Sequence, residues 1–600
     1  MKRMNLRSSF AMALLLALVL PILAACGGGT PAAAPTAAPA APEATAAPAP
    51  TAAPAPTAAP EATAAPEATA APDAGAGGPD KDGYLRMAES TWPDQLDPQK
   101  SSFSNEIAVL ILNYEGLTRF DKDLKTVPAA AEKWESNKDG TEWTFTLRDG
   151  LKYSDGSPLT SKDFAEAIYH SLDPHNPGDY QQTFFMIKGA EDVINTVVPT
   201  DEAKLTDLKA KLGIATPDDK TIKFSLTQPT PYFPTIAGIW VAYPSKKDSF
   251  ESSETWWEDA SKQIGNGPFQ ISKIDKASNL IEFKANENYW GGKPKIAGVR
   301  FQYIEDLAVA LQAYKNGEVD VMTPDANDVP TVEADAVLGK EFKSYAGACT
   351  LGWEFNLLRK PFDNPKVREA FAYGFDREAF IRDALKNSNV KTLTWIPPGY
   401  PGYDANEKRF DLDLDKAKAA LADAGFPEGK GLPEIKLTYS SSNPANQQRA
   451  EYLVQMYKKN LGVDLVLDPV EATTLTALRK DPKTFPQLTR GGWCADYPDQ
   501  QDWLSIFWHS RTEFAKNISY KDPAADKLMD AADIELDPAK RADLYQQAQV
   551  QVIGGLPMII YGNSKNQFLI KPWVKGLDFT PQDSDEPGLI TGLMNVTLGQ

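Results

Sequence analysis

The chain has 600 residues and a formal net charge of −19 at pH 7. Binding to nucleic acid phosphates depends on clustered lysine and arginine, so this charge argues against a nucleic acid partner. A single hydrophobic core stops growing near about 250–300 residues, so the chain is long enough for two or three lobes.

The first 26 residues have the pattern of an export signal. Three basic residues within the first seven positions precede an apolar run at 10–20, as a translocon requires. The run ends at Leu23-Ala24-Ala25-Cys26, which resembles a bacterial lipobox, cleaved before a cysteine whose thiol then carries diacylglycerol. A membrane-spanning helix needs about 20 apolar residues, whereas 10–25 is shorter and contains Pro21. We expect a signal peptide at 1–25 and lipidation of Cys26.

Residues 27–80 are low-complexity sequence made mostly of Ala, Pro, Thr, Glu and Gly. Such a segment buries too little apolar surface to offset its ordering entropy. Proline keeps it extended. We therefore expect residues 26–80 to be a lipidated, disordered tether that holds the folded part away from a membrane, with no later stretch apolar enough to span one.

Two cysteines remain after Cys26, namely Cys349 and Cys494. A location outside the cytoplasm permits a disulfide between them. Two buried free thiols are the alternative, because cysteine often serves only as a small core residue. Closing this loop would stabilise the fold by about 5 kcal/mol in the chain-entropy model.

Residues 81–600 have the pattern of a mixed α/β protein. Alternation predicts a strand at Trp143–Leu147, and Thr160-Ser161-Lys162-Asp163 predicts a helix start with a capping box. Strands at 436–439 and 463–467 should flank a helix at 447–459, which makes a strand-helix-strand unit. Further strands are expected at 222–226 and 280–283, and a helix at 415–424.

Several short motifs follow one another along residues 84–600. They are Leu96-Asp97-Pro98, Tyr114-Glu115-Gly116-Leu117, Thr144–Arg148, Tyr153-Ser154-Asp155-Gly156, Gly265–Phe269, Asn286–Trp290, Gly317–Asp320, Asn364–Arg368, Asp376-Arg377 and Trp493–Tyr497. The ordered series resembles family 5 extracellular solute-binding proteins, the peptide-binding components of ATP-driven importers. The last motif is similar to their oligopeptide-binding branch in particular.

The resemblance implies a two-lobed α/β fold of the periplasmic-binding-protein type, in its large peptide-binding form with an extra domain. The ligand would lie in the cleft between the lobes. Lobe I would comprise 81–114, 248–348 and 567–600, the extra domain II 115–247, and lobe III 349–566. A monomer that closes over its ligand about a hinge is the expected behaviour.

The same resemblance assigns roles at the cleft. Asp496 matches the aspartate that takes the peptide α-ammonium, and a buried cation needs such a partner. Gly492, Trp493 and Cys494 match a strand that pairs with the peptide main chain. The facing segment matches Ser102, Phe103 and Ser104, and the family disulfide matches Cys349 and Cys494. Charged cleft residues match Glu354, Arg479 and Arg490, and arginine suits a peptide carboxylate.

Three positions depart from the family pattern. Leu385 and Ala445 stand where relatives place a lysine and a histidine for peptides of different length. Ser102 stands where a glutamate is found, which removes one charge from the pocket. Peptide length and recognition of the carboxyl end are therefore left open.

Other kinds of function have weaker support in the sequence. Asp496, Asp499 and Asp502 are spaced by three, but they lack the alternating ligands and glycine of a calcium loop, and a glycosidase needs a second carboxylate placed in space. His170, His175 and His509 have no metal-binding spacing. We expect no enzyme activity, no metal and no cofactor. The alternatives are the same fold binding a dipeptide, nickel chelate or oligosaccharide, a surface hydrolase using Asp496 and Asp499, and a structural lipoprotein.

The expected function is that of an extracytoplasmic, lipid-anchored receptor for oligopeptides. Its partners would be the peptide, the membrane through the lipid anchor, and the permease subunits of an ABC transporter with a cytoplasmic ATPase. The expected location is the periplasm or the cell surface.

Overall fold

The computed structural model describes residues 78–175, 178, 180–197, 202–583 and 586–599. The predicted signal peptide, Cys26 and tether residues 27–77 lie outside these ranges. Residues 78–80, assigned to the tether above, already contact the fold: Asp80 forms an ion pair with Arg300 at 2.9 Å, and Arg86 Nη2 donates to the Gly78 carbonyl. Among the described residues, no helix has the length and apolar character needed to cross a membrane.

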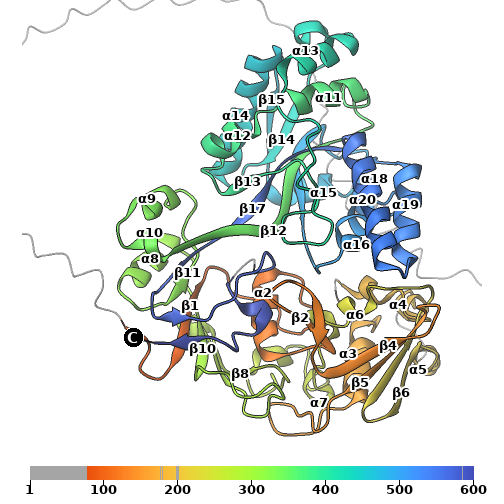
Figure 1. Ribbon diagram of the computed structural model, residues 1–600, viewed down its shortest axis with the longest axis vertical. Coiled ribbons are helices and arrows are strands. Elements are labelled where there is room, and N and C mark those ends of the chain that lie inside the picture. The colour runs from red at the N-terminus through yellow and green to blue at the C-terminus, as the bar shows by residue number, and fades with distance from the viewer. Residues whose placement is uncertain (1–77, 176–177, 179, 198–201, 584–585, 600) are drawn as a thin grey trace, which may run out of the picture. The chain divides into compact units, whose positions relative to one another are not determined.

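Within the described ranges, eleven strands form one mixed sheet (Figure 1). Ten of them follow the order β15-β14-β16-β12-β17-β11-β1-β10-β9-β8, and β13 pairs with β17. Their bounds are β1 Tyr84–Glu89, β8 Phe269–Asp275, β9 Leu280–Ala285, β10 Gly298–Tyr303, β11 Val321–Met322, β12 Phe342–Phe355, β13 Asn389–Lys391, β14 Lys436–Ser440, β15 Val466–Val470, β16 Leu488–Cys494 and β17 Met558–Ile570.

Two long antiparallel strands, β12 and β17, join the two ends of this sheet (Figure 1). The end of β17 pairs with β11, whereas the second half of β12 pairs with β16. Their mutual register is irregular between Ala346 and Thr350. Because the predicted domain boundaries at 348/349 and 566/567 fall inside these two strands, the chain crosses between the proposed lobes I and III along them. The domain bounds themselves stay a prediction.

The predicted strand-helix-strand unit is confirmed. It consists of β14, the helix α14 (Pro444–Leu461) and β15, and the two strands are parallel, with Lys436 opposite Val466. The second strand begins three residues later than predicted. Val463 and Leu465 are buried in the connection, so their apolar character reflects core packing rather than strand structure. Gly462, with φ of +71°, ends the helix.

Helices α11 (Pro365–Tyr373) and α13 (Leu414–Asp423) pack together beside α14 and share its hydrophobic core with residues of β12 and β17. The predicted helix at 415–424 is thus confirmed as α13, with Gly425 at φ +90° just beyond it. Other helices of this part are α12 Arg377–Ala379, the π-helix η5 Phe380–Ala384, η6 Pro427–Gly429 and α15 Ala472–Leu478.

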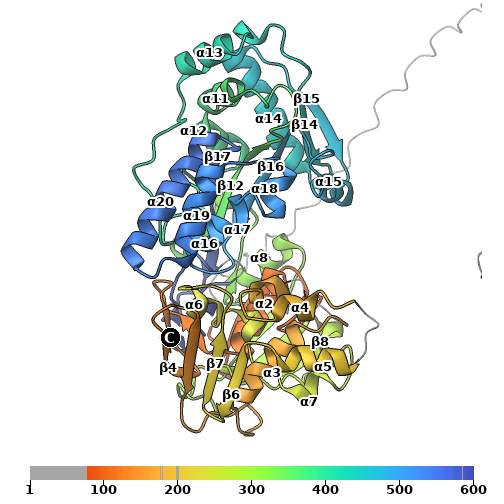
Figure 2. The same ribbon diagram turned by 90° about the vertical axis from the view of Figure 1, so that its right-hand side faces the viewer.

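Residues 115–247 contain a separate four-stranded antiparallel sheet, in the order β4-β5-β7-β6. Figure 2 shows helix α3 (Ser161–Ser171) alongside β6 and β7. The predicted strand at 143–147 is confirmed in β5, and the capping box at Thr160 is confirmed at α3, where Asp163 Oδ2 accepts from Thr160 N at 2.7 Å. The elements are β2 Thr118–Phe120, β3 Thr126–Pro128, β4 Ala131–Ser136, β5 Glu142–Leu147, β6 Ile214–Asp218, β7 Thr221–Ser225, η1 Gln181–Phe184, α4 Ala190–Ile194, α5 Glu202–Ala210, α6 Phe233–Ile236 and η2 Trp240–Ala242.

The predicted strands at 222–226 and 280–283 are also confirmed, in β7 and β9. The elements not yet named are α2 Ser104–Asn113, α7 Lys247–Phe250, η3 Trp256–Glu258, η4 Lys276–Ser278, α8 Leu307–Lys315, α9 Val329–Ala334, α10 Leu338–Glu341, β18 Val574–Lys575, η7 Leu589–Thr591 and β19 Thr597–Leu598.

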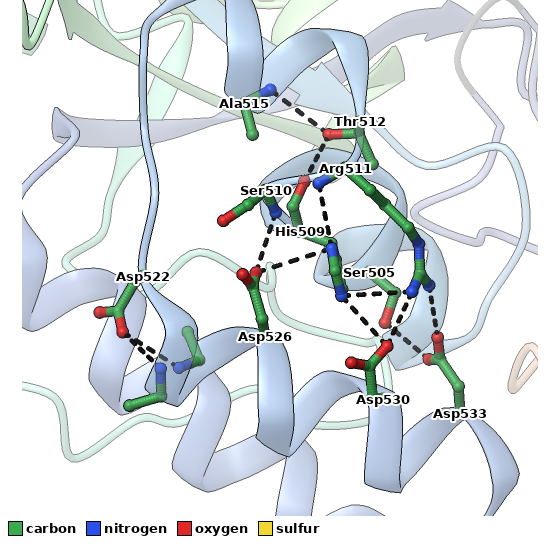
Figure 3. A network of polar contacts seen from close by, with 12 residues as sticks. Ser505, His509, Ser510, Arg511, Thr512, Ala515, Asp522, Asp526, Asp530 and Asp533 are labelled. Carbon is green, nitrogen blue, oxygen red and sulfur yellow. Dashed lines mark hydrogen bonds and ion pairs between the residues drawn. The ribbon is translucent and has the colours of Figure 1, made fainter.

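A polar network fixes the loop after α17 to the helix α19 (Figure 3). His509 Nε2 and Arg511 Nη1 both contact Asp530 Oδ1, at 3.1 and 2.7 Å, and Arg511 Nη2 pairs with the buried Asp533. Since His509 is thereby held by aspartates within a helical layer, its environment is that of a structural residue. This layer comprises α16 Gln500–Trp503, α17 Ser505–Trp508, α18 Glu513–Asn517, α19 Pro523–Ile534 and α20 Pro538–Gly555.

Candidate ligand-binding site

A cavity of about 380 Å³ is bordered by segments far apart in the sequence. This size lies within the range of roughly 300–1,000 Å³ that small-ligand sites occupy. Its wall comprises Ser102–Ser104 and neighbouring residues of α2, residues 238–240 and Tyr243, residues 492–496, and residues of the C-terminal segment 582–590, together with Arg119, Phe120, Tyr180 and Ala348.

One edge of β16 is open beside this cavity. In the described structure, β14 pairs with β16 at Leu488 and Thr489 alone, while β12 continues along the other edge to Cys494. The edge of residues 490–494 that faces away from β12 therefore has no strand partner within the described residues. Unpaired strand edges carry ready donors and acceptors, and an extended chain can add there as a further strand.

Two glycines allow β16 to lie close to β12. A Cβ on Gly491 would come within 2.0 Å of the Glu354 carboxyl carbon, and one on Gly492 within 2.3 Å of the Thr350 carbonyl oxygen. Any larger residue would push the strand away at these positions. The two glycines therefore allow the close approach of β16 to β12 beside the open edge.

The predicted disulfide between Cys349 and Cys494 is confirmed. The two cysteines are direct cross-strand partners of β12 and β16. Since Cys494 precedes Asp496 by two residues, the bond anchors the end of β16 where the candidate charge lies.

Asp496 lies partly buried in the cavity wall. The Tyr180 hydroxyl donates to its Oδ1 at 3.1 Å. Burial raises the pKa of Asp496 to about 7, and the Tyr180 hydrogen bond opposes this rise. No ion pair to Asp496 exists within the described residues, so its carboxyl group lacks the cation that would hold it ionised.

Asp502 lies next to Asp496 and is fully buried. Its Oδ2 accepts hydrogen bonds from Trp493 Nε1 at 3.1 Å and from the Asp496 backbone at 3.3 Å, while Oδ1 has no hydrogen-bond partner. Burial, then the charge of Asp496, raises the pKa of Asp502 well above its usual range. The Trp493 ring packs against Phe507 and Phe514, so Trp493 borders the open edge mainly through its backbone.

Asp499 takes a different partner. Its carboxylate forms two contacts with the Arg541 guanidinium, at 2.9 and 2.6 Å, and caps α16 through Gln501 N. The three aspartates at spacing three are therefore engaged separately, which removes the basis for pairing Asp499 with Asp496 in a hydrolase. Within the described ranges, no three His, Cys, Asp or Glu side chains are grouped so as to hold a metal ion.

Ser102, Phe103 and Ser104 line the opposite wall at the start of α2. The backbone N–H groups of Ser102 and Phe103 donate to Glu106 Oε2, at 2.9 and 3.1 Å. These two N–H groups are therefore already used within the fold. The Phe103 side chain, which is 64% exposed, forms an apolar rim.

Glu354, Arg479 and Arg490 are outside the wall of the cavity. Glu354 is buried and pairs with Arg479 Nη2 at 2.7 Å, and burial raises its pKa while Arg479 opposes the rise. Arg490 is exposed, and its Nε donates to the Tyr561 hydroxyl at 3.1 Å. Hence Glu354 and Arg479 satisfy each other, and Arg490 has no acidic partner among the described side chains.

Arg449 lies beside Arg490 and was not found from the sequence. Burial, followed by the charge of Arg490, lowers the pKa of Arg449, and its contact within α14 is the neutral Asn446. Ala445 lies in the first turn of the same helix, and Leu385 is a buried core residue. Arg449 follows Ala445 by four residues in this helix, about one turn.

Three cavity residues, Tyr180, Asp583 and Glu586, were not predicted from the sequence, and neither was the contact of Asp502 with the Asp496 backbone. Tyr180 is 316 residues from Asp496, and the two acids of the C-terminal segment follow no recognisable motif. The spacing of Asp502 from Asp496 is visible in the sequence, but it suggested a metal-binding site. It did not indicate that a buried Asp502 contacts the Asp496 backbone.

Comparison with known proteins identifies the family. The sequence model of the bacterial extracellular solute-binding proteins, family 5, matches residues 125–515, well over half of the chain. The chain belongs to this family. The predicted two-lobed α/β fold is confirmed by the same comparison together with the solved structures of relatives.

Individual relatives are similar along most of their length. The oligopeptide-binding protein OppA of Bacillus subtilis is 30% identical over 484 residues, covering 79% of this chain and 86% of that protein. The periplasmic oligopeptide-binding protein OppA of Salmonella typhimurium is 30% identical over 496 residues, with coverage of 80% and 87%. The Escherichia coli murein tripeptide binding protein MppA has a similar structure, with a TM-score of 0.69, 25% identity and coverage of 87% and 99%.

Proposed function

We propose that this solute-binding protein captures oligopeptides outside the cytoplasm and delivers them to the permease of an ABC importer. The observation that carries the proposal is the open edge of β16, which ends next to a partly buried carboxyl that has no counter-cation among the described residues. An extended peptide supplies both of the missing partners, main-chain hydrogen bonds and an α-ammonium group. The names of the relatives, two oligopeptide-binding proteins, support this ligand class.

The peptide ammonium is assigned to Asp496. A buried carboxylate is stabilised when an opposite charge lies within about 4–6 Å. Ammonium binding would therefore ionise Asp496 and release the proton that burial retains. Tyr180 remains available as a hydrogen-bond donor to the same carboxylate.

The peptide carboxylate is assigned to Arg490 and Arg449. Arg490 lies in β16, six residues before Asp496, which follows the end of that strand, and an extended chain spans roughly 20 Å over this distance at about 3.3 Å per residue. A strand-paired peptide of about five or six residues bridges the two ends. Shorter peptides would reach Asp496 without reaching the arginines, and their carboxylates would rely on bridging water.

We assign the hinge for closure of the lobes over the peptide to strands β12 and β17, which connect the proposed lobes I and III. Their register irregularity between Ala346 and Thr350 lies at the level of the cavity residue Ala348. Hinges of this kind absorb backbone changes in a few residues while the lobes move as rigid bodies. The closed form would then dock on the permease, whose ATPase drives import, without chemistry on the peptide.

Anchoring by a lipid on Cys26 completes the proposal. It rests on the lipobox-like sequence at 23–26 and on the tether composition. Metabolic labelling with a radioactive fatty acid tests it, because Cys26→Ser would abolish the label.

Native mass spectrometry tests the ligand class. The chain from residue 26 onward, with Cys26→Ser, is purified and transferred under gentle conditions. A ladder of co-purified masses that match short peptides supports the proposal. If the protein is purified without ligand, binds no member of a peptide library and binds a sugar or a metal chelate, the ligand is not an oligopeptide. The assignment of the fold would not be affected. Asp496→Asn should lose the peptides, while the exposed-site control Asp219→Asn should retain them.

A further inference from the structure

The proposed domain II contacts the proposed lobe III outside the cavity as well as at it. In both ribbon views, helix α6 lies next to the layer that contains α16, α19 and α20 (Figures 1 and 2). Tyr497, which follows the proposed ligand residue Asp496, is buried in a hydrophobic cluster made mainly of residues 110–243. Two further contacts join these two parts of the chain, and none of the residues that form them lines the cavity.

The first contact is between Arg541 of α20 and Tyr232, the residue before α6. The Arg541 guanidinium lies 5.5 Å from the centroid of the Tyr232 ring, within the distance of about 6 Å at which an aromatic face attracts a cation. Asp499 holds this guanidinium through hydrogen bonds of 2.9 and 2.6 Å, and Tyr232 is only 6% exposed. Because both partners are largely removed from water, their attraction is screened less than it would be at an exposed site.

The second contact is between Leu536 and Gly140. Leu536 lies between α19 and α20, and Gly140 lies in the turn between β4 and β5. A Cβ on Gly140 would come within 2.5 Å of Leu536 Cδ2, so the leucine side chain rests directly on the glycine backbone. Leu536 is nevertheless 40% exposed, so its truncation removes this contact with little effect on the core of either part.

Both contacts belong to the arrangement in which all three proposed parts border the cavity, as Ser104, Tyr180 and Asp496 do. Opening about the proposed hinge in β12 and β17 would move lobe III relative to domain II and separate Arg541 from Tyr232. A contact that is made in only one of two conformations shifts the population toward that conformation. The apparent affinity for a ligand rises with the fraction of protein in the conformation that holds it.

We propose that Tyr232, Arg541 and Leu536 form a clasp between domain II and lobe III, which favours the closed arrangement and raises peptide affinity without touching the peptide. These are positioning residues, because they act through the arrangement of the lobes. Where it concerns affinity, the inference rests on the proposed peptide-binding function. Its conformational part can be measured without any ligand.

Spin labels can report the separation of the two parts in the ligand-free protein. The chain from residue 26, with Cys26→Ser, carries Lys223→Cys in β7 and Lys459→Cys in α14, both at exposed positions. Cys349 and Cys494 are bonded to each other, so the labels attach to the two introduced cysteines. Pulsed electron spin resonance then gives the distribution of distances between domain II and lobe III.

Two variants weaken the clasp at its separate contacts. Tyr232→Leu removes the ring that faces Arg541, and Leu536→Ala removes the side chain that rests on Gly140. Each should shift the ligand-free distances toward longer values, and a saturating pentapeptide should restore the distances of the parent. In calorimetric titration with the same peptide, each should raise the dissociation constant several-fold, with a matching increase in the dissociation rate.

Two controls separate the clasp from a general loss of stability. Tyr232→Phe keeps the ring and should match the parent in both distance and affinity. Leu412→Ala, at a leucine of the same proposed lobe with a similar exposure of 42%, should match the parent as well. Thermal unfolding checks that each variant is folded, and if Tyr232→Leu is not, Leu536→Ala decides the matter.

Unchanged distances and affinities in the two clasp variants would overturn the inference. Weaker binding with unchanged distances would also overturn it, because the effect would then arise at the ligand site itself. Failure of the parent to bind any peptide would overturn the proposed function, whereas the ligand-free distances would still test the clasp.

Discussion

The Tyr180 hydroxyl donates a 3.1 Å hydrogen bond to Asp496 Oδ1 across 316 residues of sequence. Tyr180 belongs to the proposed domain II and Asp496 to the proposed lobe III, so the bond connects two walls of the cavity. Because it lowers the pKa that burial raises, it also supports the ionised form of the carboxyl that an ammonium group requires.

Tyr180→Phe should therefore weaken peptide binding without removing it. The lost hydrogen bond to a charged group is worth about 1.5–3 kcal/mol, and the pKa of Asp496 should rise further. Calorimetric titration with one pentapeptide at pH 7 and pH 8 measures both effects, since the deficit should be smaller at pH 8. Equal affinities of variant and parent at both pH values would exclude the role.

Peptide binding should depend on pH through Asp496. Below its pKa of about 7 the carboxyl is neutral and loses its attraction for the ammonium, whereas above about 8 the peptide α-amino group begins to deprotonate. Affinity should be highest between these values. Near pH 7, titration in two buffers of different ionisation enthalpy should reveal proton release on binding, and an N-acetylated peptide should bind weakly and release none.

The stability of the ligand-free protein should depend on pH through Asp583. In the folded state the pKa of Asp583 is raised from 3.8 to about 7. Its contribution to the free energy of unfolding is therefore complete below the unfolded-state pKa, and it is lost as the pH rises through about 7. Asp583→Asn should thus gain stability relative to the parent as pH increases from 4 to 8. Chemical denaturation at several pH values measures this difference, and a constant difference would contradict the assigned burial.

Gly491→Ala should destabilise the fold. The added Cβ would meet the Glu354 carboxyl at 2.0 Å and displace it from Arg479, and overpacking of this kind costs about 1–3 kcal/mol. Denaturant unfolding provides the measurement. Gly599→Ala is the control, because a Cβ there meets nothing within 4 Å, and an equal effect of both substitutions would refute the argument.

Arg449 and Arg490 should discriminate between free and amidated peptide ends. A hexapeptide with a free carboxylate should bind the parent more tightly than its C-terminal amide, because the two guanidinium groups have no acidic partner within the described residues. Arg490→Gln or Arg449→Gln should shrink that difference several-fold. If the amide binds as well as the acid in the parent, the carboxylate end lies elsewhere.

Local and linear patterns were sufficient for a good part of this protein. The capping box at Thr160 and the unit built on β14, α14 and β15 depend on neighbours in sequence, and both formed where expected. The ordered motifs indicated the family, and with it the pairing of Cys349 with Cys494. The boundary of β15 was misplaced because burial, rather than strand structure, explains Val463 and Leu465.

The composition of the cavity was decided by tertiary structure. Asp496 stood out in the sequence, but only the fold brings Tyr180 and Asp502 into contact with it and places Asp583 in the same cavity wall. Whether a carboxyl group is ionised and able to bind a cation depends on its surroundings, because burial and nearby charges set its pKa. Sequence alone therefore indicated that this chain is a two-lobed solute-binding protein, and it singled out Asp496 as a candidate ligand-binding residue. The fold decided that Asp583 and Glu586 line the same cavity as Asp496, because which side chains meet depends on distance in space and not in sequence.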